Sequence, residues 1–277
     1  MVRPNVLVVS LLLLAAAPAR AQTAQGRERP PARDLGTFAF GTPWADAALL
    51  AAGLSMAAIG TYALEPPSTA RAPLVGPPHV PANDSAGNTS NAIVALSLGG
   101  TLALSLVVDH QDGRRGVDML RAPLVLGEAA LVTMGVVSLL KNTLGECRPR
   151  AWDEASHACV GTDPGHPTED DRRSWPSGHT APAFAMVGAT LALAILPTGG
   201  RPRYLPVLAL ATVLAGATMS LRVVAGAHDW ADTTSGAAIG LGLGFASAAT
   251  HLVRTGGPSV SLSADGRRAL VVLRGRF

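Results

Sequence analysis

Six apolar segments of about 18 residues each dominate this 277-residue chain. A helix needs about 20 mostly apolar residues to cross a bilayer, so each segment is near the minimum for a transmembrane helix. The segments are rich in Ala and Gly, which favours close packing between helices. We therefore expect an all-α fold, a six-helix bundle embedded in a membrane. The segments are 47–64, 91–108, 122–140, 180–197, 204–221 and 233–252. Residues 65–90 carry two Pro-Pro pairs and several Asn, Ser and Gly residues and are expected to be a loop.

The composition agrees with this expectation. Hydrophobic residues make up 48% of the chain and charged residues only 15%, which is typical of membrane or heavily buried chains. The formal net charge is +3 and the arginines are scattered, so nucleic-acid binding is not expected.

The two ends of the chain differ from its centre. Residues 1–21 have a basic start, an apolar run and an Ala19-Arg20-Ala21 site, as a cleaved signal peptide does. Residues 22–45 are predicted to be a flexible arm, 46–253 the helical domain, and 254–277 a tail. Within the tail, Ser259 to Leu273 alternates weakly around Asp265-Gly266, which predicts a short β-hairpin, with a disordered tail as the alternative.

Two sequence signals predict opposite orientations of the chain in the membrane. Arginines in 109–121, in 198–203 and beyond 253 would hold those loops inside. A cleaved signal peptide would deliver residue 22 to the outside and invert that arrangement. A first segment that does not span, a retained leader or a periplasmic helical bundle would each remove the conflict.

Polar residues gather in three short motifs at the ends of the predicted helices. Lys141 is the only lysine of the chain and precedes Arg148-Pro149. In an up-and-down bundle, the three motifs fall on one face. The second motif is Pro176-Ser177-Gly178-His179, and the third is Arg222, His228 and Asp232.

These motifs resemble the type 2 phosphatidic acid phosphatase and vanadium haloperoxidase superfamily. The family pattern is Lys-x6-Arg-Pro, then Pro-Ser-Gly-His, then Ser-Arg-x5-His-x3-Asp, and the resemblance covers residues 90–250. Every charged position matches in order and spacing, whereas Leu221 replaces the family serine before Arg222.

The resemblance implies a role for each residue. His228 would be the nucleophile that forms a phosphohistidine, with Asp232 holding its far nitrogen. His179 would be the acid that protonates the leaving group. The cations and a helix start would bind the phosphoryl group without a metal or other cofactor. The phosphate-binding set is Lys141, Arg148, Ser177, Gly178 and Arg222.

Other polar residues receive simpler interpretations. Cys147 and Cys159 would form a disulfide in an exported protein, with two free thiols as the alternative. Glu128 lies within an apolar segment and suits either a functional role or a buried hydrogen bond. His251 has no predicted partner. The acidic loop residues are expected to be solvated, namely Asp163, Glu169, Asp170 and Asp171.

The sequence therefore predicts a metal-independent phosphatase in the cell envelope, embedded in the inner membrane with its site facing the periplasm. The expected partners are the membrane and a phosphomonoester or pyrophosphate, most favourably carried by a lipid. The alternatives are a soluble periplasmic acid phosphatase for small phosphoesters, a vanadate-dependent haloperoxidase in which vanadate replaces phosphate, and a bundle that binds phosphate without turnover.

Overall fold

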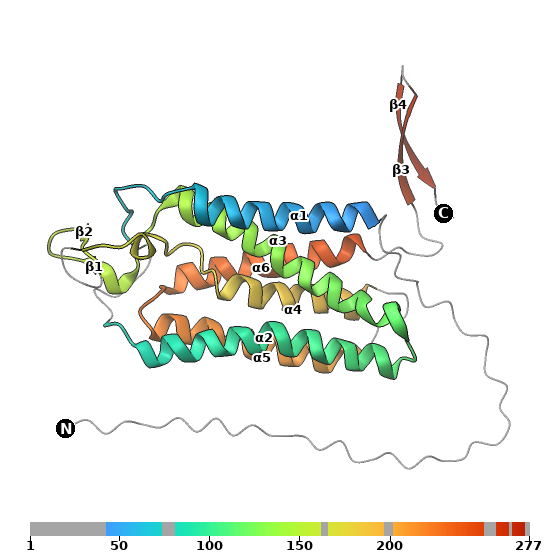
Figure 1. Cartoon of the computed structure of the whole chain (residues 1–277), viewed down its shortest axis with the longest axis horizontal. Coiled ribbons are helices and arrows are strands. Elements are labelled where there is room, and N and C mark those ends of the chain that lie inside the picture. The colour runs from blue at the N-terminus through green and yellow to red at the C-terminus, as the bar shows by residue number, and fades with distance from the viewer. Residues whose placement is uncertain are drawn as a thin grey trace, which may run out of the picture. The chain divides into compact units, whose positions relative to one another are not determined.

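The computed structural model describes residues 43–73, 81–161, 166–196, 202–251, 259–265 and 268–274. Six α-helices in these residues confirm the predicted helical bundle (Figure 1). Each corresponds to one apolar segment. The helices are α1 (Pro43–Ala58), α2 (Asp84–Gln111), α3 (Arg121–Leu144), α4 (Thr180–Ile195), α5 (Leu205–Val224) and α6 (Trp230–Thr250).

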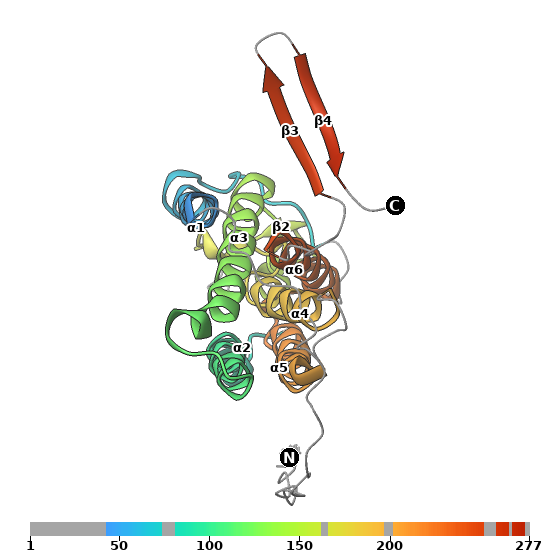
Figure 2. The ribbon, with the colours of Figure 1, turned by 90° about the vertical axis from the view of Figure 1, so that its right-hand side faces the viewer.

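Helix α4 lies in the interior and packs against α3, α5 and α6, while α1 lies on α3 and α2 lies on α5 (Figure 2). The core between these helices includes Leu126 of α3, Met186 and Leu193 of α4, and Val207 of α5. Since nearly every residue of α4 is buried, this helix is apolar on all sides.

Small residues bring α4 and α6 together. A Cβ atom on Gly240 would lie 2.0 Å from the carbonyl oxygen of Ala181, and one on Gly244 would lie 2.2 Å from that of Ala185. The backbones approach so closely that only glycine fits between them. These contacts hold the middle of α6 against the first turns of α4.

The described residues also form four short β-strands. Strands β1 (Trp152–Asp153) and β2 (Ala158–Cys159) form an antiparallel pair in the loop between α3 and α4. The predicted C-terminal hairpin is confirmed as β3 (Ser259–Asp265) paired antiparallel with β4 (Arg268–Arg274). The predicted signal peptide and nearly all of the predicted arm lie outside the described residues.

Two sequence interpretations were wrong. Residues 65–90 were expected to be a loop, but α2 begins at Asp84 because the side chain of Asn83 accepts a hydrogen bond from the Ala86 N–H and caps the helix. His251 was expected to have no partner, but its Nε2 lies 3.1 Å from Glu128 Oε2, and both side chains are buried. Glu128 is therefore a paired residue between α3 and α6.

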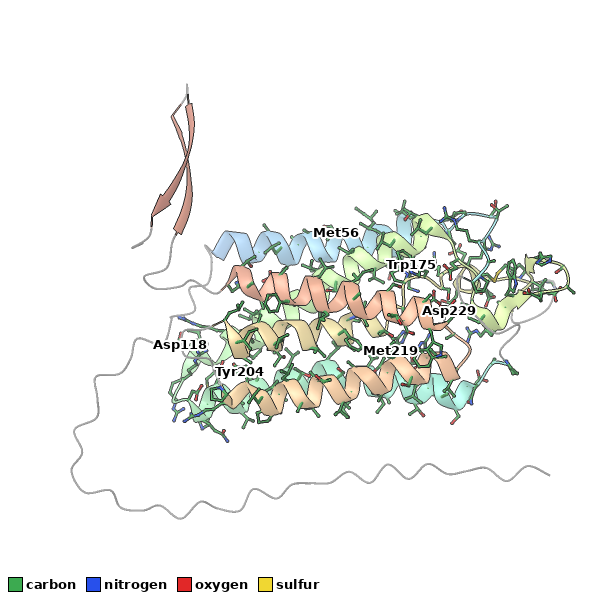
Figure 3. All side chains as sticks on the ribbon, turned by 180° about the vertical axis from the view of Figure 1, so that it is seen from behind. Met56, Asp118, Trp175, Tyr204, Met219 and Asp229 are labelled. Carbon is green, nitrogen blue, oxygen red and sulfur yellow. A yellow bond between two sulfur atoms is a disulfide. The ribbon has the colours of Figure 1, made fainter. Side chains whose placement is uncertain are left out.

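The predicted motifs do meet at one end of the bundle. Trp175 and Asp229 lie at that end in Figure 3, whereas Asp118 and Tyr204 lie at the opposite end. The motif end contains the last turns of α3 and α5 and the first turns of α2, α4 and α6.

Three helical segments among the described residues are long and apolar enough to cross a membrane: Asp84–Gln111, Gly116–Leu144 and Pro202–Val224. Less than half of each is buried inside the bundle. Large apolar side chains point outward from them, including Leu96, Leu124 and Val213.

Candidate active site

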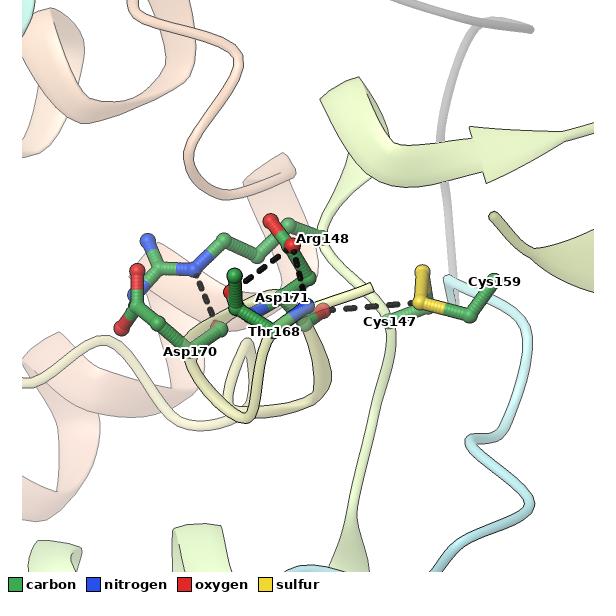
Figure 4. Close-up of a disulfide and its surroundings, with 6 residues drawn as sticks. All are labelled: Cys147, Arg148, Cys159, Thr168, Asp170 and Asp171. Atoms are coloured by element: carbon green, nitrogen blue, oxygen red, sulfur yellow. Dashed lines mark hydrogen bonds and ion pairs between the residues drawn. A yellow bond between two sulfur atoms is a disulfide. The ribbon is translucent and has the colours of Figure 1, made fainter. Parts of the chain in front are cut away.

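The site is built on the loop that follows α3. Gly145 ends that helix with φ 59° and donates its N–H to the Lys141 carbonyl oxygen. A Cβ here would lie 2.5 Å from Pro67 Cδ, so glycine is required by both conformation and space. Two residues later, Cys147 forms a disulfide with Cys159 (Figure 4). The bond holds the loop in place directly before Arg148.

Arg148 is buried and held by several acceptors. Its Nη2 lies 2.6 Å from Asp170 Oδ1, its Nε donates to the Asp170 carbonyl oxygen at 2.8 Å, and its Nη1 donates to the Ala227 carbonyl oxygen at 3.3 Å. Asp170 also lies 3.6 Å from Arg150. Asp170 is exposed, as expected, and it also pairs with two arginines.

The expectation that the acidic loop residues are solvated is wrong for the next residue. Asp171 is buried and accepts hydrogen bonds from the Thr168 N–H and hydroxyl group, which closes the turn drawn in Figure 4. Glu169 pairs with Arg173 at an exposed position. Asp163 lies outside the described residues.

Lys141 lies in the last turn of α3 and donates from Nζ to the carbonyl oxygens of Arg173 and Ser174. A Cβ on Gly178 would lie 3.1 Å from Lys141 Cε. The absence of a side chain at Gly178 therefore gives the lysine its position beside the start of α4.

The second motif ties α4 to α6. The Ser177 N–H donates to the Asp232 carbonyl oxygen at 3.1 Å, and its hydroxyl group accepts a hydrogen bond from Thr180 Oγ1 at 2.9 Å. Gly236 faces the Ser177 backbone, where a Cβ would lie 3.0 Å from the Ser177 oxygen. The same contacts set His179 at the entrance of α4.

His228 and Asp232 form a buried pair. His228 Nδ1 lies 3.1 Å from Asp232 Oδ2, and the same oxygen accepts hydrogen bonds from Ser174 Oγ and the Asp229 N–H. Since a carboxylate can only accept, Nδ1 carries the proton. The lone pair of the His228 ring is therefore on Nε2.

The cations of the first and third motifs act on both histidines. Burial lowers the pKa of His228 well below its usual value, and the charges of Lys141, Arg148 and Arg222 lower it further. Burial and the same three cations lower the pKa of His179 to about 3. Both rings are consequently neutral at pH 7. The structure thus brings the predicted histidines and cations together.

A cavity of about 290 Å³ opens at this end. Arg148, His179 and Arg222 line it, whereas Lys141 and His228 are not among its lining residues. The sequence interpretation missed a polar wall of this cavity contributed by α2 and its cap. That wall consists of Asn83, Asp84, Gly87, Asn88 and Asn91.

Another residue of α2, outside the cavity lining, was also missed. Ser90 is fully buried, and its hydroxyl oxygen accepts a hydrogen bond from Arg222 Nη1 at 3.3 Å. An asparagine cap followed by polar residues is the sequence signal that would have placed these groups on a helix.

The described residues contain one group of carboxylates spaced closely enough to hold a metal ion, formed by Glu146, Asp229 and Asp232. Oxygen atoms of the three lie within 4.8 Å of one another, and all three residues are buried. Independence from metals therefore stays a prediction.

A helical bundle that brings two neutral histidines and three cations together at one end, with one of the histidines and two of the cations lining a cavity, is suited to the handling of phosphate esters. Residues 122–255 match the model of the PAP2 superfamily, which supports membership of the type 2 phosphatidic acid phosphatase superfamily. The family implies phosphatase activity on phosphoesters. No curated protein and no solved structure matches the chain.

Proposed function

We propose that this protein is a metal-independent phosphatase that hydrolyses lipid phosphates through a phosphohistidine intermediate. The observation that carries the proposal is the buried, neutral ring of His228, held by Asp232 and influenced by three cations. A neutral imidazole whose Nδ1 is occupied by a carboxylate can attack only from Nε2.

In the first step, His228 Nε2 attacks phosphorus, the P–N bond forms, and the bond to the leaving oxygen breaks. His179 donates a proton to that oxygen. Arg148, Arg222 and Lys141 stabilise the negative charge on the equatorial oxygens. In the second step, water attacks phosphorus while His179 accepts its proton, and the P–N bond breaks.

The low pKa of His179 fits this cycle. Without substrate, nearby cations keep the ring unprotonated. A bound phosphate brings negative charge into the same cavity and favours the protonated ring. We expect His179 to gain its proton when substrate binds, which prepares it to protonate the leaving group.

The lipid assignment rests on the outer surface of the bundle. Helices α2, α3 and α5 are candidate membrane spans with outward apolar side chains, and the cavity lies at their end. A lipid headgroup at the bilayer surface would meet a site in that position. We further propose that this end faces the periplasm, because the arginines of 109–121 lie at the opposite end of the bundle and such loop arginines favour the inner side of a membrane.

The test replaces His228 with Ala in purified protein. The variant should lose turnover by at least 1,000-fold, on the order of the effect of removing a covalent nucleophile, together with the acid-labile phosphoenzyme. Activity is measured as phosphate released from phosphatidic acid, a polyprenyl pyrophosphate and a small soluble phosphomonoester, with and without EDTA.

The matched control is His110→Ala, which changes an exposed histidine on α2. It should keep wild-type activity. If His228→Ala keeps a tenth of the wild-type rate, His228 is not the nucleophile. A rate that EDTA abolishes and magnesium restores would contradict metal independence.

A further inference from the structure

A buried acid outside the three motifs contacts the predicted catalytic pair. Glu146 lies in the loop between Gly145 and Cys147, with only 4% of its surface exposed. Its backbone pairs with that of Arg71, and its carbonyl oxygen accepts the Ser174 N–H at 2.9 Å. An oxygen atom of its side chain lies within 4.8 Å of oxygen atoms of Asp232 and Asp229.

The two oxygens of Asp232 have different surroundings. Oδ2 faces His228 Nδ1, Ser174 Oγ and the Asp229 N–H. Oδ1 is buried and accepts no hydrogen bond from an amide, hydroxyl or basic group of the described residues. The carboxyl group of Glu146 is therefore the donor available to this oxygen.

A hydrogen bond between two carboxyl groups requires one proton. With Asp229 within 4.8 Å as well, three ionised acids in this buried space would repel one another strongly. Burial and the neighbouring Asp229 raise the pKa of Asp232, in agreement with a protonated pair.

We propose that Glu146 is a positioning residue that holds a proton and donates it in a hydrogen bond to Asp232 Oδ1. This inference rests on the proposed function. The hydrogen bond fixes the carboxylate so that Oδ2 faces the imidazole, and it directs His228 Nε2 toward the phosphate. The pair loses its proton as pH rises, and two adjacent negative charges then displace Asp232.

The other charged groups near this pair are present in every variant, so a comparison of variants isolates the contribution of Glu146. They are Lys141 at the end of α3, whose charge acts on Asp232, and His228 and Asp229 next to the start of α6. Arg148 and Arg222 act on His228 as well.

The experiment compares wild type with Glu146→Gln and Glu146→Ala across pH 5–9 in purified protein. Gln donates a hydrogen bond at every pH, so E146Q should keep kcat within about threefold at pH 6 and should move the alkaline loss of activity upward by about one pH unit or more. E146A should lose about tenfold to 100-fold in kcat at pH 6, with KM changed far less.

Glu65→Gln serves as the control, because Glu65 is exposed, and its profile should match wild type. Wild type at neutral pH should also show the infrared band of a protonated carboxyl group, which E146Q removes. That spectrum tests the proton even where a variant does not fold.

The proposal is overturned if activity declines at the same alkaline pH in E146Q as in wild type, or if wild type lacks the infrared band of a protonated carboxyl group. A wild-type rate that EDTA abolishes also overturns it, in favour of a cation bound by the three acids. These results differ from a failure of the proposed function, in which His228→Ala keeps activity and forms phosphoenzyme.

Discussion

At the residue scale, Asp170 competes with the phosphate of the proposed substrate, because both would pair with the guanidinium group of Arg148. Its carboxylate pairs with Arg148 at 2.6 Å and lines the same cavity, although 60% of its side chain is exposed. Asp170→Asn should therefore bind product more tightly and lower the inhibition constant of inorganic phosphate by about threefold to tenfold. Glu169→Gln is the neighbouring control. Weaker phosphate inhibition in D170N would instead show that Asp170 holds Arg148 in its binding position.

The two histidines also make stability depend on pH. Their pKa values are lowered in the fold, to about 3 for His179, whereas an unfolded chain protonates histidine at about 6.5. The unfolded state therefore binds more protons below pH 6.5. Their contribution is present above that pH and is lost as pH falls, by up to about 1.4 kcal/mol per pH unit for each ring.

Thermal unfolding of purified protein between pH 7.5 and pH 4.5 measures this effect. His179→Gln should flatten the profile, and so should added phosphate, because a bound anion raises the histidine pKa values. A melting temperature that rises on acidification would contradict the conclusion that both histidine rings are neutral in the folded protein.

At the element scale, the contact between α4 and α6 tolerates no added volume. Gly240→Ala places a methyl group 2.0 Å from the Ala181 oxygen, so the helices must separate. We expect a loss of at least about 3 kcal/mol in stability, seen as a reduced yield of folded protein and a lower melting temperature. Gly242→Ala lies on the same helix with nothing within 4 Å of the added Cβ, and it should fold normally.

Helices were predictable here where apolar residues continue for a full segment, and their polar ends were not. The first turns of α2 carry Asp84, Ser85 and Asn88, which give no apolar period, so this stretch was interpreted as a loop. The same limit hid part of the site. Ser90 reaches Arg222 across 132 residues, a contact that no local pattern encodes.

The motif residues were predictable because their types and spacing form a pattern, and the alternation of helices placed them at one end. Asp170 and Glu146 were not, because each acts through a side chain from a distant part of the chain. Their sequence neighbourhoods look like ordinary polar loops. Only the fold shows that these acids lie beside the cations and the predicted catalytic pair.

At the scale of the whole molecule, water and lipid make opposite demands on the outer faces of the bundle. Val213 lies near the middle of α5 with 68% of its surface exposed, and Leu205 lies at the end of the same helix with 54% exposed. In water, an arginine at either position would change stability by no more than about 0.5 kcal/mol. In a bilayer, an arginine at the helix centre costs about 2.5–3.5 kcal/mol, whereas one near the end reaches the polar interface.

Val213→Arg should therefore reduce the amount of folded protein in the membrane severalfold, while Leu205→Arg should not. The measurement is the protein that remains in membranes after an alkaline wash and elutes as a single species in detergent. Equal yields for the two variants, or release of wild-type activity by osmotic shock without detergent, would favour a soluble periplasmic bundle. The difference between the two sites depends only on the surrounding solvent, so this pair tests membrane embedding without reference to catalysis.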